Sequence, residues 1–318
     1  MSLQRGVCVL VLLAGLFAAH LAHALDYQLK PRKIAEDSYV FIGKTEDFTT
    51  QNGGNIVNTA FIVTPEGVLV IDSGPSRLYG EQMRRAIAQV TPLAVKKVLI
   101  THHHPDHFFG NQAYADVPVH ALPEAITAMK QEGANFADNL YRMSGDWMKD
   151  TESRPATQPL KPGAFTFGGR EFELIALHGH TPSDLAVFDR SSGVLYAGDL
   201  VFFQRTPTTP HAEIKEWLSS LDALQKIPYK LLVPGHGEPV TDARAIEQTR
   251  RYLIWLETAL RKAAADGLDM PEVLKLPIPS EFAGMPLVNS EYERSIAHLY
   301  PKIEAGELGQ AQVLRTGR

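Results

Sequence analysis

Short apolar runs recur along most of this chain and are separated by amphipathic stretches. The runs predict buried strands, because each is only a few residues long and is bounded by polar or turn-forming residues. They are NTAFIVT (58–64), GVLVI (67–71), AVKKVLI (94–100), FELIAL (172–177), GVLYA (193–197) and YKLLV (229–233). Helical patterns fall between them; in 213–224, Ile214, Trp217 and Leu221 share one apolar face. This mixture of strands and helices predicts an α/β sandwich.

Two further helices are expected at 81–90, after the second strand, and at 242–265, ending near Gly267. The segment 139–163 has the composition of an inserted helix and loop between the two halves of the domain. Beyond Gly267 the composition turns to proline, glycine and charged residues. The predicted organisation is therefore a signal peptide at 1–24, a catalytic domain at 25–267 and a C-terminal extension at 268–318.

The first 24 residues have the pattern of a secretory signal peptide. Arg5 is followed by the apolar run VCVLVLLAGLFAAHLAHA, which closes with the small-residue pattern Ala22-His23-Ala24. A membrane anchor is the alternative, but the run is short and the cleavage pattern is well placed. We therefore expect cleavage near Ala24, a periplasmic or secreted protein, and no stable membrane anchor afterwards.

Cleavage would also remove Cys8, the single cysteine of the chain. The mature protein would then have no disulfide and no thiolate ligand, so any metal site must use histidine, aspartate and glutamate. The formal net charge would change from −5 to −6 through loss of Arg5. An acidic chain without basic blocks does not fit a nucleic-acid-binding protein, and a small-molecule substrate is expected instead.

The predicted strands run repeatedly into residues that bind metals. The residues at or just beyond five strand ends are Asp72, the segment THHHPDH (101–107), His180, Asp199 and His236. Loops at one edge of a layered sheet are common ligand sites, because the strands hold them rigidly while solvent can still enter. These side chains are therefore expected to converge.

Side-chain alternation sorts the segment THHHPDH. Alternate residues of an extended segment point the same way, so His102 and His104 can share a metal while His103 points elsewhere. Pro105 bends the chain and directs Asp106 and His107 to a neighbouring position. Imidazole nitrogens and carboxylate oxygens suit zinc, whose catalytic sites keep one position open for water.

The pattern H-x-H-x-D-H, followed by separate His, Asp and His residues, resembles the metallo-β-lactamase superfamily. The resemblance covers about residues 35–265 and includes VIDSG, THHHPDH, GHTPSD, YAGD and PGHGEP. It implies a four-layer αββα sandwich of two mixed β-sheets flanked by helices. It also implies two zinc ions, with iron or a mixed pair as the alternative.

Transferred residue by residue, the resemblance implies that His102, His104 and His180 bind the first metal. Asp106, His107 and His236 would bind the second, Asp199 would bridge both, and Asp72 would orient the cluster. His178 and His180 have the spacing of an H-x-H pair, but the flanking residues match the family pattern only at His180, so His178 is not expected to be a ligand. His103 is expected to pack near the ligands, whereas His120, His211 and His298 belong to no motif.

Paired divalent metals lower the pKa of a shared water and supply hydroxide at neutral pH. The expected reaction is hydrolysis of an ester-like, thioester or amide bond, including lactones and lactams, with Asp106 as the catalytic proton relay. No serine or cysteine nucleophile is required.

The ligand set is most similar to glyoxalase II and lactonase members of the superfamily. The chain as a whole, including GGNIVNTAFIVT, resembles exported zinc metallohydrolases associated with quinoprotein systems, which makes a periplasmic quinoprotein dehydrogenase a candidate partner. Two alternatives stay open: an iron-dependent oxidoreductase such as a persulfide dioxygenase, and a non-catalytic accessory factor for such a dehydrogenase.

Three segments are candidates for the substrate pocket because they adjoin the expected ligands. They are the loop 45–55, the pair Phe108-Phe109 and the pair Phe202-Phe203. Aromatic walls beside a metal would suit an apolar substrate group. Packing in the hydrophobic core is the alternative for each phenylalanine pair.

Overall fold

The computed structural model describes residues 25–316 of the chain. A seven-stranded sheet is formed by the N-terminal half, with strand order β1 to β7 following the sequence. Pairing is antiparallel from β1 to β4 and parallel from β4 to β7. The strands are β1 (Arg32–Ala35), β2 (Ser38–Phe41), β3 (Thr59–Thr64), β4 (Gly67–Ile71), β5 (Val95–Leu99), β6 (Val119–Ala121) and β7 (Gln158–Pro159).

A second sheet of five strands follows, in the order β12-β11-β10-β9-β8. Its pairs are antiparallel except for β11 and β12, which are parallel. Its strands are β8 (Gly163–Phe167), β9 (Arg170–Leu177), β10 (Asp184–Asp189), β11 (Val194–Tyr196) and β12 (Leu231–Val233). Both sheets are therefore mixed.

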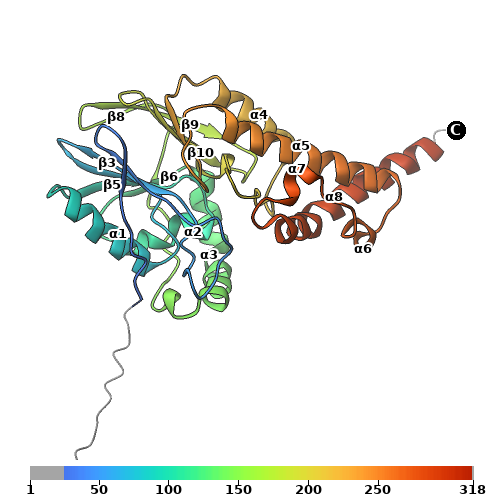
Figure 1. Cartoon of the computed structure of the whole chain (residues 1–318), viewed down its shortest axis with the longest axis horizontal. Coiled ribbons are helices and arrows are strands. Elements are labelled where there is room, and N and C mark those ends of the chain that lie inside the picture. The colour runs from blue at the N-terminus through green and yellow to red at the C-terminus, as the bar shows by residue number, and fades with distance from the viewer. Residues whose placement is uncertain (1–24, 317–318) are drawn as a thin grey trace, which may run out of the picture.

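Helices cover the outer faces of the two sheets. Helices α1 and α3 lie on the side of the first sheet, and α4 and α5 lie on the side of the second (Figure 1). The bounds are α1 (Arg77–Val90), α2 (Pro105–Phe108), α3 (Pro123–Ser144), α4 (Ile214–Gln225), α5 (Arg244–Ala265), α6 (Met270–Val273), α7 (Ser280–Ala283) and α8 (Val288–Thr316). This arrangement confirms the predicted sandwich of two mixed sheets flanked by helices. Among residues 25–316, no helix combines the length and apolarity that a membrane crossing requires.

Strand β10 shows how the layers are held together. Leu185 and Val187 belong to the hydrophobic cluster that packs the two sheets together, whereas Ala186 and Phe188 belong to the cluster under α4 and α5. Successive side chains of a strand point to opposite faces, so one strand anchors both layers. Full burial of each large apolar side chain contributes roughly 1.5–3 kcal/mol relative to exposure. The apolar stretch LAVF is short and bounded by Asp184 and Asp189, which is why the sequence pattern did not single out this strand.

The C-terminal helix α8 shares the core of the second half. Tyr292, Ile296 and Tyr300 are buried in the same cluster as Leu256 and Leu260 of α5. The segment therefore packs along α5 and extends the helical side of the second sheet (Figure 1). The predicted signal peptide, residues 1–24, lies outside the described residues.

Candidate metal centre

The predicted ligands come from both sheets. The turn after β5 and the start of α2 provide His102, His104, Asp106 and His107. The second sheet provides His180 after β9, Asp199 in the short helical turn after β11, and His236 after β12. The structure brings these side chains together into two adjoining groups of potential metal ligands.

The first group comprises His102, His104, His180 and Asp199, all buried. His180 Nε2 lies 2.8 Å from His104 Nδ1 and 3.3 Å from Asp199 Oδ2. His102 Nε2 lies 3.9 Å from the same carboxylate oxygen. The four ligand atoms all lie within 4.8 Å of one another, close enough to share one metal ion.

The second group comprises Asp106, His107 and His236. His236 Nε2 lies 3.4 Å from Asp106 Oδ2, and His107 Nε2 lies 3.7 Å from that oxygen. Asp199 adjoins this group as well, because its Oδ1 is 3.1 Å from His107 Nε2 and its Oδ2 is 3.2 Å from His236 Nε2. One carboxylate therefore lies between the two groups.

Several ligand atoms in this centre have no hydrogen-bond partner although they are buried. They include His102 Nε2, His107 Nε2 and Asp199 Oδ1. Buried polar atoms in native proteins are nearly always paired, and leaving them unpaired is costly. Unpaired imidazole nitrogens and carboxylate oxygens that face a shared point fit a bound divalent cation.

Burial keeps most of these imidazoles neutral. It lowers the pKa of His102 and His104 well below the ordinary histidine value and lowers that of His180 to about 3. A neutral imidazole has a free lone pair, which is the form that binds metals.

His107 is the exception among the ligands. Burial lowers its pKa, but nearby carboxylates outweigh burial and raise the pKa well above the ordinary value. These carboxylates belong to Asp199, Asp106 and Asp72. Three carboxylates around one buried imidazole give this site a concentrated negative charge, which a bound divalent metal would neutralise.

Asp72 supports the second group from the end of β4. Its Oδ1 accepts a hydrogen bond from the Thr101 backbone N–H at 2.8 Å, and its Oδ2 accepts one from the Thr101 hydroxyl at 2.8 Å. His107 Nδ1 also lies 2.8 Å from Asp72 Oδ2. A proton held on Nδ1 leaves Nε2 free to face the second group.

His236 is oriented by the backbone in a similar way. Its Nδ1 lies 2.7 Å from the carbonyl oxygen of Ile56, which belongs to the first half of the chain. The ring also stacks on Phe202, with an interplanar angle of 9° and a centroid distance of 5.0 Å. Its Nε2 therefore points at the carboxylates of Asp106 and Asp199.

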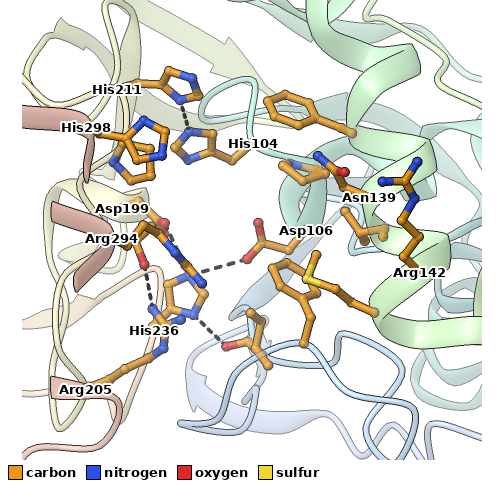
Figure 2. A pocket seen from close by; sticks show the side chains of 18 residues that line it. His104, Asp106, Asn139, Arg142, Asp199, Arg205, His211, His236, Arg294 and His298 are labelled. Atoms are coloured by element: carbon orange, nitrogen blue, oxygen red, sulfur yellow. Dashed lines mark hydrogen bonds and ion pairs between the residues drawn. The ribbon is translucent and has the colours of Figure 1, made fainter. Parts of the chain in front are cut away.

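A cavity of about 480 Å³ opens in front of the ligands. His104, Asp106, Asp199 and His236 form part of its wall, and Figure 2 shows the direct contact between Asp106 and His236. The cavity's other lining residues include the apolar side chains of Phe48, Ile56, Phe136, Leu140 and Met143, the guanidinium groups of Arg142, Arg205 and Arg294, and the imidazole of His298. Helix α8 thus contributes directly to this cavity, through Arg294 and His298.

The structure corrects the predicted aromatic wall of the pocket. Phe108, Phe109 and Phe202 are fully buried in the hydrophobic core, and Phe203 packs half-buried against the second core cluster. None of the four lines the cavity. They follow ligand residues in sequence, but their side chains point into the layers behind the ligands. Of the predicted segments, only the loop 45–55 reaches the cavity, through Phe48.

Two other histidines of the predicted cluster lie beside the ligand groups. His103 is buried with its Nε2 3.3 Å from Glu132 Oε1 of α3. His178 is exposed, and its Nδ1 lies 3.0 Å from the carbonyl oxygen of Pro182. Neither belongs to the two groups that contain the predicted ligands.

His211 was assigned no role from the sequence, but it lines the cavity next to a ligand. Its Nδ1 lies 2.8 Å from His104 Nε2. The loop that contains His211 has no motif of the kind that marks the predicted ligands, so only the three-dimensional arrangement identifies this residue. The arginines and the aliphatic side chains of the cavity wall were also missed, because they lie on helices α3 and α8 and in loops without a ligand motif.

The fold agrees with comparisons to known proteins. The sequence model of the metallo-beta-lactamase superfamily matches residues 52–236, and the chain belongs to that superfamily. A solved metallo-beta-lactamase from Pontibacter korlensis shares the fold, with a TM-score of 0.58 and 22% identity over 71% of this chain and 99% of that one.

Two curated relatives act on different bonds. The linear primary-alkylsulfatase of Pseudomonas sp. is 23% identical over 299 residues, which cover 79% of this chain and 56% of that enzyme. The acyl-coenzyme A thioesterase MBLAC2 of Gallus gallus is 24% identical over 218 residues, or 58% of this chain and 73% of that enzyme. The chain therefore spans little more than half the length of the alkylsulfatase.

Proposed function

We propose that this protein is a dinuclear zinc hydrolase that cleaves an ester-like, thioester or amide bond in a small molecule. The observation that carries the proposal is the position of Asp199, whose two oxygens face both ligand groups. His102, His104 and His180 would hold the first zinc, and Asp106, His107 and His236 the second. Zinc ions bound in this way lower the pKa of coordinated water and polarise the bond under attack.

Residues of the cavity wall would provide proton transfer and substrate binding. Asp106 belongs to the second group only, and its carboxylate lines the cavity. It is therefore placed to accept and return the proton of the attacking water. The apolar side chains Phe48, Phe136 and Leu140 exclude bulk water and offer a surface for an apolar substrate group. Relatives that hydrolyse alkyl sulfates and acyl thioesters are consistent with a substrate that carries such a chain.

Metal analysis and a substrate panel test the proposal. The purified protein should bind two zinc ions per chain and hydrolyse at least one member of a panel of aryl esters, acyl thioesters, lactones, β-lactams and alkyl sulfates. His180→Ala should lose metal and activity, because His180 contacts both His104 and Asp199. His178→Ala is the matched control, since this exposed neighbour lies outside both groups.

Full zinc occupancy without turnover of any of these substrates would refute the hydrolase. A single iron and no zinc would instead favour the iron-dependent oxidoreductase.

We further propose that the protein is exported. The support is the sequence pattern of residues 1–24, and the expected mature N-terminus is Leu25. N-terminal sequencing of the protein from the periplasmic fraction checks this, and a retained N-terminal segment would contradict it. The proposed partner, a periplasmic quinoprotein dehydrogenase, is tested by co-purification from the same fraction.

A further inference from the structure

His211 lies at the rim of the cavity, in the loop between Asp199 and helix α4. Its ring stands next to that of His104, and the two are joined by the contact between His211 Nδ1 and His104 Nε2 at 2.8 Å (Figure 2). The imidazole is half-buried, with 34% of its side chain exposed. It is therefore close enough to a predicted zinc ligand to determine how that ligand is held.

The other nitrogen of His104 faces the first ligand group. His104 Nδ1 lies 2.8 Å from His180 Nε2, and both rings are buried. A neutral imidazole has one lone pair and one N–H, on different nitrogens. If Nδ1 offers its lone pair to a cation, the proton must reside on Nε2, and that Nε2–H group donates a hydrogen bond to His211 Nδ1.

Glu132 of helix α3 continues this chain of contacts. Its Oε2 lies 3.4 Å from His211 Nε2, and its Oε1 lies 3.3 Å from His103 Nε2. A carboxylate facing Nε2 favours the His211 tautomer with a proton on Nε2 and a lone pair on Nδ1. That is the tautomer required to accept a hydrogen bond from His104.

Two other ligands have equivalent partners already described. His107 has Asp72, and His236 has the Ile56 carbonyl oxygen. Among the described residues, His211 is the only hydrogen-bond partner of His104 Nε2. Partners of this type fix ring orientation and tautomer, and their loss typically costs about 10–100-fold in metal affinity.

We propose that His211 is the positioning residue for the zinc ligand His104, and that Glu132 in turn positions His211. This relay fixes His104 as the tautomer with a proton on Nε2 and the Nδ1 lone pair directed at the first ligand group. It rests on the proposed function only in requiring that this group binds zinc. His103, His104 and His211 also lie close enough together to form a third metal site, and the experiment separates the two arrangements.

The test compares two replacements of His211 by zinc titration against a competing chelator. His211→Phe keeps an aromatic ring but offers no acceptor, so affinity for the first zinc should fall about 10–100-fold. His211→Asn places a side-chain amide oxygen near the position of Nδ1 and should recover most of this affinity. His120→Phe is the matched control and should leave affinity unchanged, since His120 lies outside the cavity and the ligand groups, with its Nε2 3.1 Å from Lys97 Nζ.

Nitrogen-15 NMR of the imidazoles gives a second readout that packing alone would not change. The zinc-loaded protein should show His104 protonated on Nε2, and His211→Phe should alter that resonance while His120→Phe does not. Unchanged zinc affinity in His211→Phe would overturn the proposal, as would three zinc ions per wild-type chain falling to two in this variant. Tight zinc binding without hydrolysis would refute the proposed reaction but leave the role of His211 intact.

Discussion

Replacing Asp72 with asparagine tests the support of the second ligand group with little change of shape. Asp72 has a left-handed backbone conformation, with φ of 57°. Asparagine is among the residues that tolerate this conformation, whereas alanine would add strain. The substitution therefore changes the hydrogen bonds and the charge, and leaves the turn after β4 in place.

The cost follows from the number of donors that Asp72 accepts. The Thr101 N–H faces one carboxylate oxygen, and the Thr101 hydroxyl and His107 Nδ1 face the other. An asparagine amide has one oxygen, so either orientation leaves an NH₂ group opposite an N–H donor. Loss of a hydrogen bond to a charged group costs about 1.5–3 kcal/mol.

The amide orientation decides where this cost is observed. If the NH₂ group faces His107, the His107 proton moves to Nε2 and zinc at the second group should bind about 10–100-fold more weakly. If it faces Thr101, a buried backbone N–H is left unpaired and the unfolding free energy should fall by about 1–3 kcal/mol. Zinc titration against a chelator and urea unfolding of the metal-free protein measure the two effects. A variant that matches the wild type in both measurements would refute this account of Asp72.

Three further perturbations have expected outcomes. In Gly235→Ala the added Cβ would overlap Asp199 Oδ1, so zinc content and activity should both be lost. Gly284→Ala is the control and should behave as wild type, because a Cβ there meets nothing within 4 Å. Retained zinc in Gly235→Ala would contradict the bridging position of Asp199. Burial raises the pKa of Glu291 above its ordinary value of 4.5, against the opposing effect of Arg205 and Arg294. The folded state therefore retains this proton longer than the unfolded state, and stability should decline as pH rises from 4.5 through the raised pKa. Glu291→Gln should flatten that decline in urea unfolding across mildly acidic pH, and an unchanged slope would show that Glu291 is not its source. Removing metal with a chelator should lower the melting temperature, because zinc present at 100 times its Kd stabilises the folded state by about 2.7 kcal/mol; an unchanged melting curve would argue against bound metal.

The strands with continuous apolar runs were predictable because their environment is uniform. GVLVI was predicted as a strand with the same bounds as β4, which is buried along its whole length. The edge strands β1, β7 and β8 were not predicted, because many of their residues are exposed and their apolar pattern is correspondingly weak. An apolar pattern marks a strand only where its side chains are buried, and these three strands bury few of theirs.

The ligand residues were predictable because residues that follow neighbouring parallel strands lie at the same edge of a sheet. Asp199 and His236 are 37 residues apart, yet both follow strands that are neighbours in one sheet and run in parallel. His211 and Arg294 could not be found in this way. One lies in a loop and the other on a C-terminal helix, and the positions of both depend on packing between distant elements.

The division of the ligands between the two sheets has a consequence for how the metal centre is assembled during folding. Each ligand group needs residues from both halves of the chain, and His236 is the last of them to be synthesised. The N-terminal sheet can begin to form earlier, but it holds only part of either coordination set. Neither ligand group is therefore complete until the second sheet has docked on the first, and a chain truncated before residue 236 would lack one ligand of the second group however well its first half had folded.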